Sequence, residues 1–151
     1  MSYSVAADIE SEFKSLSFSA SGSGITTAEV TEYIAQEDAA IESILSRVYV
    51  VPITGTTALS IVKKISIDRT AFRVAKILNM KKSLPIPDQL VAQELNEGAA
   101  YLESEKLLRE LQAGTASLID APRVGDTAQG LSSYNATNGI TPTFERGVDQ
   151  W

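Results

Sequence analysis

Carboxylate pairs are the residues of this chain that come closest to a catalytic or metal-binding pattern. Glu94 and Glu97, and then Glu103 and Glu105, fall within single turns of one expected helix. A helical di-metal site combines glutamates with Glu-x-x-His motifs, but the chain contains no histidine and no cysteine. The commonest general base and the thiolate ligands of zinc are therefore missing. We interpret these glutamates as a solvated helix face and expect no enzyme, no metal and no cofactor.

The Ser- and Gly-rich stretch at residues 15–24 has the composition of a phosphate-binding loop but lacks its key residues. A P-loop places Lys and then Ser or Thr directly after its glycines, because the lysine must reach the phosphates. Here Gly24 is followed by Ile25 and Thr26. We therefore expect this stretch to be a flexible connector between two helices.

The overall composition is that of a globular protein, with 44% apolar and 21% charged residues. The 151 residues are enough for one helical core, with or without an appendage. A membrane span needs about 18 consecutive apolar residues, and no stretch approaches that length. The N-terminus also lacks a basic segment followed by an apolar run. We expect a protein that is neither secreted nor inserted in a membrane.

The clearest helix start lies at Thr26. Thr26 and Glu29 have the spacing of a capping box, in which each side chain accepts a hydrogen bond from the backbone N–H of the other residue. Ile25 and Val30 have the spacing of a hydrophobic staple. An apolar stripe at helical spacing continues from there to Val48, which predicts a helix of about six turns.

Pro52 should end that helix, because proline has no backbone N–H and disfavours helical geometry at the preceding residue. We expect the helix to stop near Tyr49. The apolar residues Val50, Val51 and Ile53 would then form an extended plug that needs a partner surface.

Three further helices are predicted from apolar stripes at helical spacing and from cap or stop signals. They are residues 3–14 with Ser4 as cap, residues 58–80 with Thr56 or Thr57 as cap, and residues 89–112 with Asp88 as cap and Gly114 as stop. The sequence thus predicts an all-α fold, a small bundle of about four helices over residues 1–114.

The net charge of −6 hides three segments of alternating sign. Residues 1–45 hold eight acidic residues and one basic residue, residues 46–82 one acidic and eight basic, and residues 83–120 seven acidic and two basic. Since opposite charges attract, we expect antiparallel helices to pair within one subunit; alternatively, part of the complementarity lies between neighbouring subunits. Asp68 should pair with Lys64 one turn before it.

Residues 115–151 show no helical period and are rich in Thr, Ser, Gly and Asn. A purely disordered tail has little reason to keep spaced aromatic and branched apolar residues. We therefore expect an extended C-terminal arm that becomes ordered on a partner, by main-chain pairing and by side chains that fill pockets. An inert flexible tail is the alternative. The candidate partner-binding residues are Leu118, Ile119, Leu131, Tyr134, Ile140, Phe144, Arg146 and Trp151.

Two motifs in the helical part span roughly residues 3–80, about half of the chain. The first reads Asp-Ala-Ala-Ile-x-x-x-Leu-x-Arg-x-Tyr-x-x-Pro, and the second, on the following helix, reads Ile-x-x-Asp-Arg-x-Ala-x-Arg. Their residues are Asp38, Ala39, Ala40, Ile41, Leu45, Arg47, Tyr49 and Pro52, and then Ile65, Asp68, Arg69, Ala71 and Arg73. This combination resembles the head–tail connector, or adaptor, proteins of tailed bacteriophages.

The resemblance implies a structural virion protein at the head–tail junction, assembled in the host cytoplasm. It implies a homo-oligomeric ring, twelvefold like the portal, with C-terminal arms on the portal protein and a neck, stopper or tail protein as the next partner. Contact with passing DNA would be to phosphates, without sequence reading. Candidate subunit-interface residues are Arg47, Tyr49, Val51, Ile53, Arg69 and Arg73. The alternative function is a small helical DNA-binding or regulatory module that uses the basic helix at residues 58–82.

Overall fold

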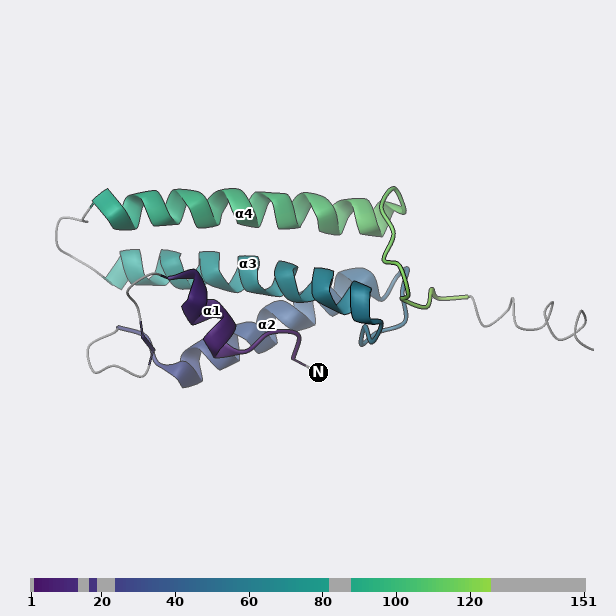
Figure 1. Ribbon diagram of the computed structural model, residues 1–151, viewed down its shortest axis with the longest axis horizontal. Helices are drawn as coiled ribbons and strands as arrows, with labels where there is room; N and C mark the ends of the chain where they lie inside the picture. Colours follow the sequence, from purple (N-terminus) through teal and green to yellow (C-terminus); the bar gives the residue numbers. More distant parts are fainter. Residues whose placement is uncertain (1, 14–16, 19–23, 82–87, 126–151) are drawn as a thin grey trace, which may run out of the picture.

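Four helices make up the described part of the protein, and α3 lies at its centre (Figure 1). The computed structural model describes residues 2–13, 17–18, 24–81 and 88–125, with the backbone alone at 81 and 88–95. Helices α1 and α2 lie on one side of α3 and α4 runs along the other side. No strand occurs in these ranges, so the predicted all-α fold is confirmed. The helices are α1 Ala6–Glu12, α2 Thr27–Leu45, α3 Thr56–Lys81 and α4 Asp88–Ala113.

The start of α2 confirms the predicted capping box. The Thr26 backbone N–H donates to Glu29 Oε2 at 2.7 Å, and the Glu29 N–H donates to Thr26 Oγ1 at 3.3 Å. Ile25 and Val30 are buried in one apolar cluster, as the staple requires. The helix ends at Leu45, four residues before the predicted stop near Tyr49, although the Tyr49 N–H still donates to the Leu45 carbonyl at 2.8 Å.

Ser4 does not cap α1, contrary to the prediction. Val5 is the N-cap, and its backbone N–H donates to Asp8 Oδ2 at 2.9 Å. Ser4 is buried, and its Oγ lies 2.8 Å from the Oγ of Ser66 in α3. The Ser4 hydroxyl group therefore contacts α3 and does not form the predicted cap of α1.

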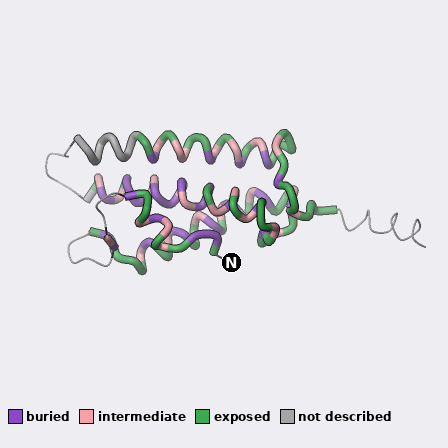
Figure 2. The backbone as a smooth tube through the Cα atoms, viewed as in Figure 1, coloured by how far each residue is buried: buried purple, intermediate pink, exposed green. Residues whose placement is uncertain are grey.

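Buried apolar side chains form two clusters, and buried positions follow α3 along its length (Figure 2). The cluster that contains α1, here the α1 cluster, consists of Ile9, Phe13, Phe18, Ile25, Val30, Ile34, Ala71, Val74, Ala75 and Leu78. The second, here the end cluster, consists of Tyr3, Ile41, Leu45, Tyr49, Ile53, Ala58, Val62, Ile65, Leu108, Leu111 and Leu118. Phe18 comes from the predicted connector, so part of that stretch belongs to the core.

A polar layer separates the two clusters. Asp38 lies on α2 between residues of the α1 cluster and the end cluster, and Ser66 and Thr70 lie at the matching level of α3; all three are buried. The Asp38 carboxyl group accepts the Tyr3 N–H at 2.8 Å and the Ser66 hydroxyl at 2.5 Å. Since a buried polar group without a hydrogen bond is costly, this layer favours one alignment of α2 on α3. Among the described helices, none combines the length and apolar character needed to cross a membrane.

Candidate interaction surfaces

The first part of the predicted arm folds back onto the helices. Leu118 is 4% exposed in the end cluster, and its backbone N–H donates to the Tyr49 hydroxyl at 3.0 Å. Gly114, with a φ of 76°, ends α4 as predicted and lets the chain turn back. Leu118 is therefore a core residue and not an arm residue, and the folded body extends beyond residue 114 at least to Val124. We call residues 115–125 the arm root.

The arm root pairs with the segment that follows α2. Tyr49 and Arg123 form an isolated antiparallel β-bridge. It is flanked by two hydrogen bonds of 2.8 Å, from the Val50 N–H to the Pro122 carbonyl and from the Val124 N–H to the Val48 carbonyl. The Arg123 guanidinium carbon lies 5.9 Å from the centre of the Tyr49 ring. The extended exit from α2 was predicted correctly, but its partner lies in the same chain.

Asp120 caps α3 from the arm root. Its carboxylate accepts the backbone N–H groups of Thr57 at 2.9 Å and Ala58 at 3.0 Å. Anions at a helix N-terminus are stabilised by these otherwise unpaired donors and by the helix dipole. The predicted caps, Thr56 and Thr57, are instead the first two residues of α3, so that prediction was wrong. The carboxylate of Asp120, about 60 positions away, therefore caps α3 in place of the predicted threonine.

The predicted subunit-interface residues after α2 are mostly internal. Tyr49 and Ile53 are fully buried in the end cluster, and Val51 is half-buried against it. The Ile53 N–H donates to the Tyr3 hydroxyl at 3.1 Å, which in turn donates to Glu42 at 3.0 Å. Val51 and Ile53 of the predicted plug thus find their partner surface within their own subunit, whereas Val50 stays 47% exposed. Of this group, Arg47 is exposed.

Three large apolar side chains remain exposed on the segments that close this end of the bundle. Val50 is 47% exposed, Ile119 is 69% exposed and Val124 is 58% exposed. They lie on residues 46–55 and on the arm root. We call these two segments together the end face. Arg47 adds a positive charge to the same face. The end face is the described surface that best combines exposed apolar groups with a fixed backbone.

Arg69 and Arg73 serve to hold helices together within the subunit. Arg69 has a side chain only 12% exposed and pairs with Glu37 of α2 at 2.9 Å and with Glu105 of α4. Arg73 lies 3.3 Å from Glu37, and its guanidinium carbon sits 4.5 Å from the centre of the Tyr33 ring. These contacts confirm that complementary charges pair inside one subunit, as expected. Arg69 is largely enclosed by these contacts, whereas the Arg73 side chain is still 35% exposed.

The basic residues in the first half of α3 are likewise engaged. Lys63 pairs with Asp8 of α1 at 2.9 Å, and Lys64 pairs with Asp68 as predicted. Lys76 is exposed. Because α3 is the central helix and four of its cations meet carboxylates, the described structure gives no continuous basic face of the kind that binds nucleic acid. This arrangement does not favour the DNA-binding alternative.

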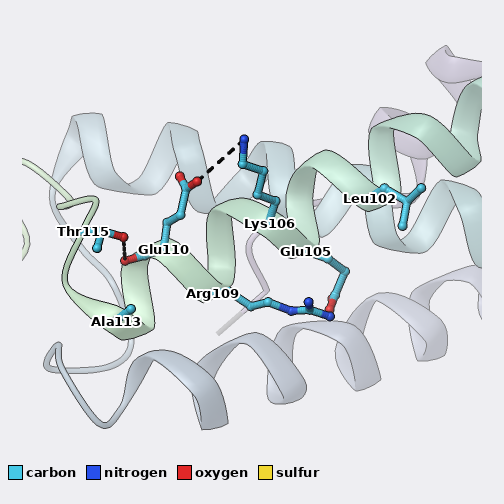
Figure 3. Close-up of a pocket in the computed structure, with 7 residues that line it drawn as sticks. All are labelled: Leu102, Glu105, Lys106, Arg109, Glu110, Ala113 and Thr115. Carbon is cyan, nitrogen blue, oxygen red and sulfur yellow. Dashed lines mark hydrogen bonds and ion pairs between the residues drawn. The ribbon is translucent and has the colours of Figure 1, made fainter.

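A shallow groove of about 350 Å³ runs along the last turns of α4 (Figure 3). The Lys106 Nζ lies 3.8 Å from a carboxylate oxygen of Glu110, one turn further along α4, and the side chains of Arg109 and Glu105 extend toward α2. Leu102, which is 68% exposed, lies at the end remote from the arm root. Thr115 closes the other end, where its hydroxyl donates to the Glu110 carbonyl at 3.2 Å. Both charge signs line the groove, so it does not select a charged ligand.

Two buried carboxyl groups lie where α3 and α4 meet. Asp68 and Glu97 are 7% and 8% exposed. Burial raises the pKa of Asp68, and its pair with Lys64 opposes that shift. Burial, together with the charges of Glu12 and Asp68, raises the pKa of Glu97. Within the described residues no group of three acidic side chains is placed to hold a metal ion.

The remaining predicted arm residues lie outside the described part of the chain; they are Leu131, Tyr134, Ile140, Phe144, Arg146 and Trp151. Sequence reasoning also missed Tyr3 and Asp120, whose roles depend on partners about 50 and 60 residues away. The sequence feature that could have indicated Asp120 is an acidic residue that lies between apolar residues and shortly before Pro122. Comparisons with models of known protein families, with curated proteins and with solved structures found no match to this chain.

Proposed function

We propose that this protein is a head–tail connector subunit of a tailed bacteriophage, part of a homo-oligomeric ring that docks on the portal and joins the capsid to the neck or tail. The observation that carries the proposal is the arm root, which continues from the helical body and is held to it by the β-bridge and the Asp120 cap. In the sequence, the 26 residues after Gly125 include spaced apolar and aromatic side chains. A packed helical body followed by such an arm suits a protein that binds its assembly partners through the arm.

The residues of the two connector-like motifs support the proposal through their structural roles. Asp38 builds the polar layer, Ile41 and Leu45 lie in the end cluster, and Tyr49 receives the arm root. Arg69 bridges three helices. The motifs therefore consist largely of residues that hold α2 on α3 and position the start of the arm, which is what a shared fold would require.

The proposed mechanism is mechanical. Free subunits stay monomeric at low concentration until the portal collects them, because ordering the arm costs conformational entropy. Many identical weak contacts around a ring then add up to stable attachment. In this scheme the arm beyond Gly125 reaches the portal, and the helical bodies stand beside one another.

The test compares the full chain with a chain that ends at Gly125. Both should show the same helical circular dichroism, since every described contact is retained. Only the full chain should co-sediment with portal rings from the phage that encodes it. Co-sedimentation of the shortened chain would show that the arm is not the portal-binding element. A full chain that neither binds portal rings nor increases in mass with them would refute the proposed function.

A further inference from the structure

The end face has the properties of a docking surface that is ready before its ligand arrives. Its exposed residues Val50, Ile119 and Val124 sit on backbone that is fixed by the β-bridge, by buried Leu118 and by the Asp120 cap. A surface that is already ordered binds with a smaller loss of conformational entropy.

We propose that the end face binds the last eight residues, 144–151, of a neighbouring copy of this chain. The inference rests on the proposed ring, because it requires a second copy beside the first; it gives residues 144–151 to that copy and leaves residues 126–143 of the arm for the portal. Residues 144–151 read Phe-Glu-Arg-Gly-Val-Asp-Gln-Trp, with an aromatic residue at each end and Val148 between them. Aromatic side chains contribute most to binding when they enter apolar surfaces, and the end face offers such a surface.

Charge supports the same pairing. The segment 144–151 carries Glu145 and Asp149 against the single base Arg146, so it is net negative. The end face carries exposed Arg47 close to Val50 in the chain. Opposite charges at the rim of an interface favour correct orientation and faster association more than they add affinity. Arg47, predicted as a subunit-interface residue, thus keeps that role in this proposal.

The length of chain beyond Gly125 allows this segment to reach a neighbour. The arm root runs away from the helices where it ends (Figure 1). The 26 residues that follow span up to roughly 86 Å when extended, whereas the 26 residues of α4 span roughly 39 Å. The aromatic residues Phe144 and Trp151 lie near the far end of this reach, so a neighbouring copy is within range of them. In a ring, exchange between neighbours repeats the contact at every subunit.

A cross-linking experiment on the full chain tests the pairing. One copy carries a photo-activatable phenylalanine analogue at position 151, and the second copy is labelled with heavy isotopes. The two are mixed at high concentration and irradiated, and cross-linked peptides are identified by mass. We expect links from position 151 of the light chain to residues 48–51 or 119–124 of the heavy chain. Links within the light chain alone, or no links to the end face, would overturn the inference.

Substitutions in the heavy chain sharpen the test. Val124→Asp should lower the yield of these links on the order of tenfold, because it places a charge in the apolar contact and repels the acidic segment. The matched control is Met80→Asp, another exposed apolar residue, 76% exposed at the far end of α3, which should leave the yield unchanged. Equal effects of the two substitutions would count against the end face. Circular dichroism checks that both variants fold.

The failure of this inference can be told apart from failure of the proposed function. If the full chain binds portal rings but gives no links between copies, the connector role stands and the exchange of segments does not. If links between copies form but portal rings are not bound, the docking surface stands and the connector role does not.

Discussion

The backbone of Asp120 lies so close to Gly55 that a Cβ atom on residue 55 would fall 2.4 Å from the Asp120 carbonyl oxygen. Side chains of any size are therefore excluded at Gly55, and this close approach brings the Asp120 carboxylate to the first N–H groups of α3. The arm root and the start of α3 thus form one unit.

Asp120→Ala should lower the free energy of unfolding by about 1 kcal/mol, the usual cost of removing a helix cap. Urea unfolding followed by circular dichroism measures this loss. Gln112→Ala is the control, because the Gln112 side chain is exposed on α4. An unchanged unfolding midpoint for Asp120→Ala would show that water caps α3 equally well.

Asp38→Ala should be more damaging, at about 2–3 kcal/mol, because it leaves the buried Tyr3 N–H and the Ser66 hydroxyl without their acceptor. The same unfolding measurement applies. Glu32→Ala, an exposed acidic residue on the same helix, serves as control. Similar small losses for both variants would contradict the structural role of the polar layer.

Thr70→Val should stabilise the protein by about 1 kcal/mol. The buried Thr70 hydroxyl has no hydrogen-bond partner within the described residues, and such a group costs about 1–3 kcal/mol. Valine keeps the shape and removes the unsatisfied group. A rise in the thermal unfolding midpoint is expected, and a fall would mean that the hydroxyl is satisfied in solution.

Arg69→Ala should cost about 3 kcal/mol, since it leaves the Glu37 and Glu105 carboxylates without their shared partner in a poorly solvated place. Arg69→Lys keeps the charge but loses the planar fork that reaches two helices, so its loss should be smaller but clear. Urea unfolding of the native chain and of both variants measures their free energies of unfolding. A lysine variant as stable as the native chain would show that charge alone is sufficient.

The raised pKa of Glu97 predicts how the stability of the protein depends on pH. Its pKa is raised in the folded state by burial and by the charges of Glu12 and Asp68, with Lys64 acting in the opposite direction. The folded protein therefore holds the Glu97 proton more tightly than the unfolded chain does. The resulting stability is present below the unfolded pKa and is lost as the pH rises through the folded pKa.

Glu97→Gln should consequently be more stable than the native chain at neutral pH, and this advantage should shrink as the pH falls through the acidic range. Unfolding curves of both proteins from neutral to acidic pH measure the difference directly, since other titrating groups are common to both. An advantage that stays constant with pH would exclude titration of Glu97 as its cause.

Sequence alone predicted those features whose partners lie within one or two turns. The Thr26 and Glu29 capping box, the stop at Gly114, the Lys64 and Asp68 pair and the all-α fold all depend on local spacing. Helical stripes also placed the four helices to within a few residues, apart from α1 and the end of α2.

The errors arose where a distant segment took over a local role. The α3 cap comes from Asp120, the Ser4 hydroxyl serves α3, and the plug after α2 is covered by the arm root. Such choices depend on tertiary packing, which overrides local preference. They extended the folded body beyond residue 114 and transferred Leu118 from the arm to the core.

The β-bridge between Tyr49 and Arg123 has a mechanical consequence. A load applied to the chain beyond Gly125 is transmitted first to the bridge and to the Asp120 cap, and from there to the junction between α2 and α3. The apolar clusters are shielded from tension until those polar links give way.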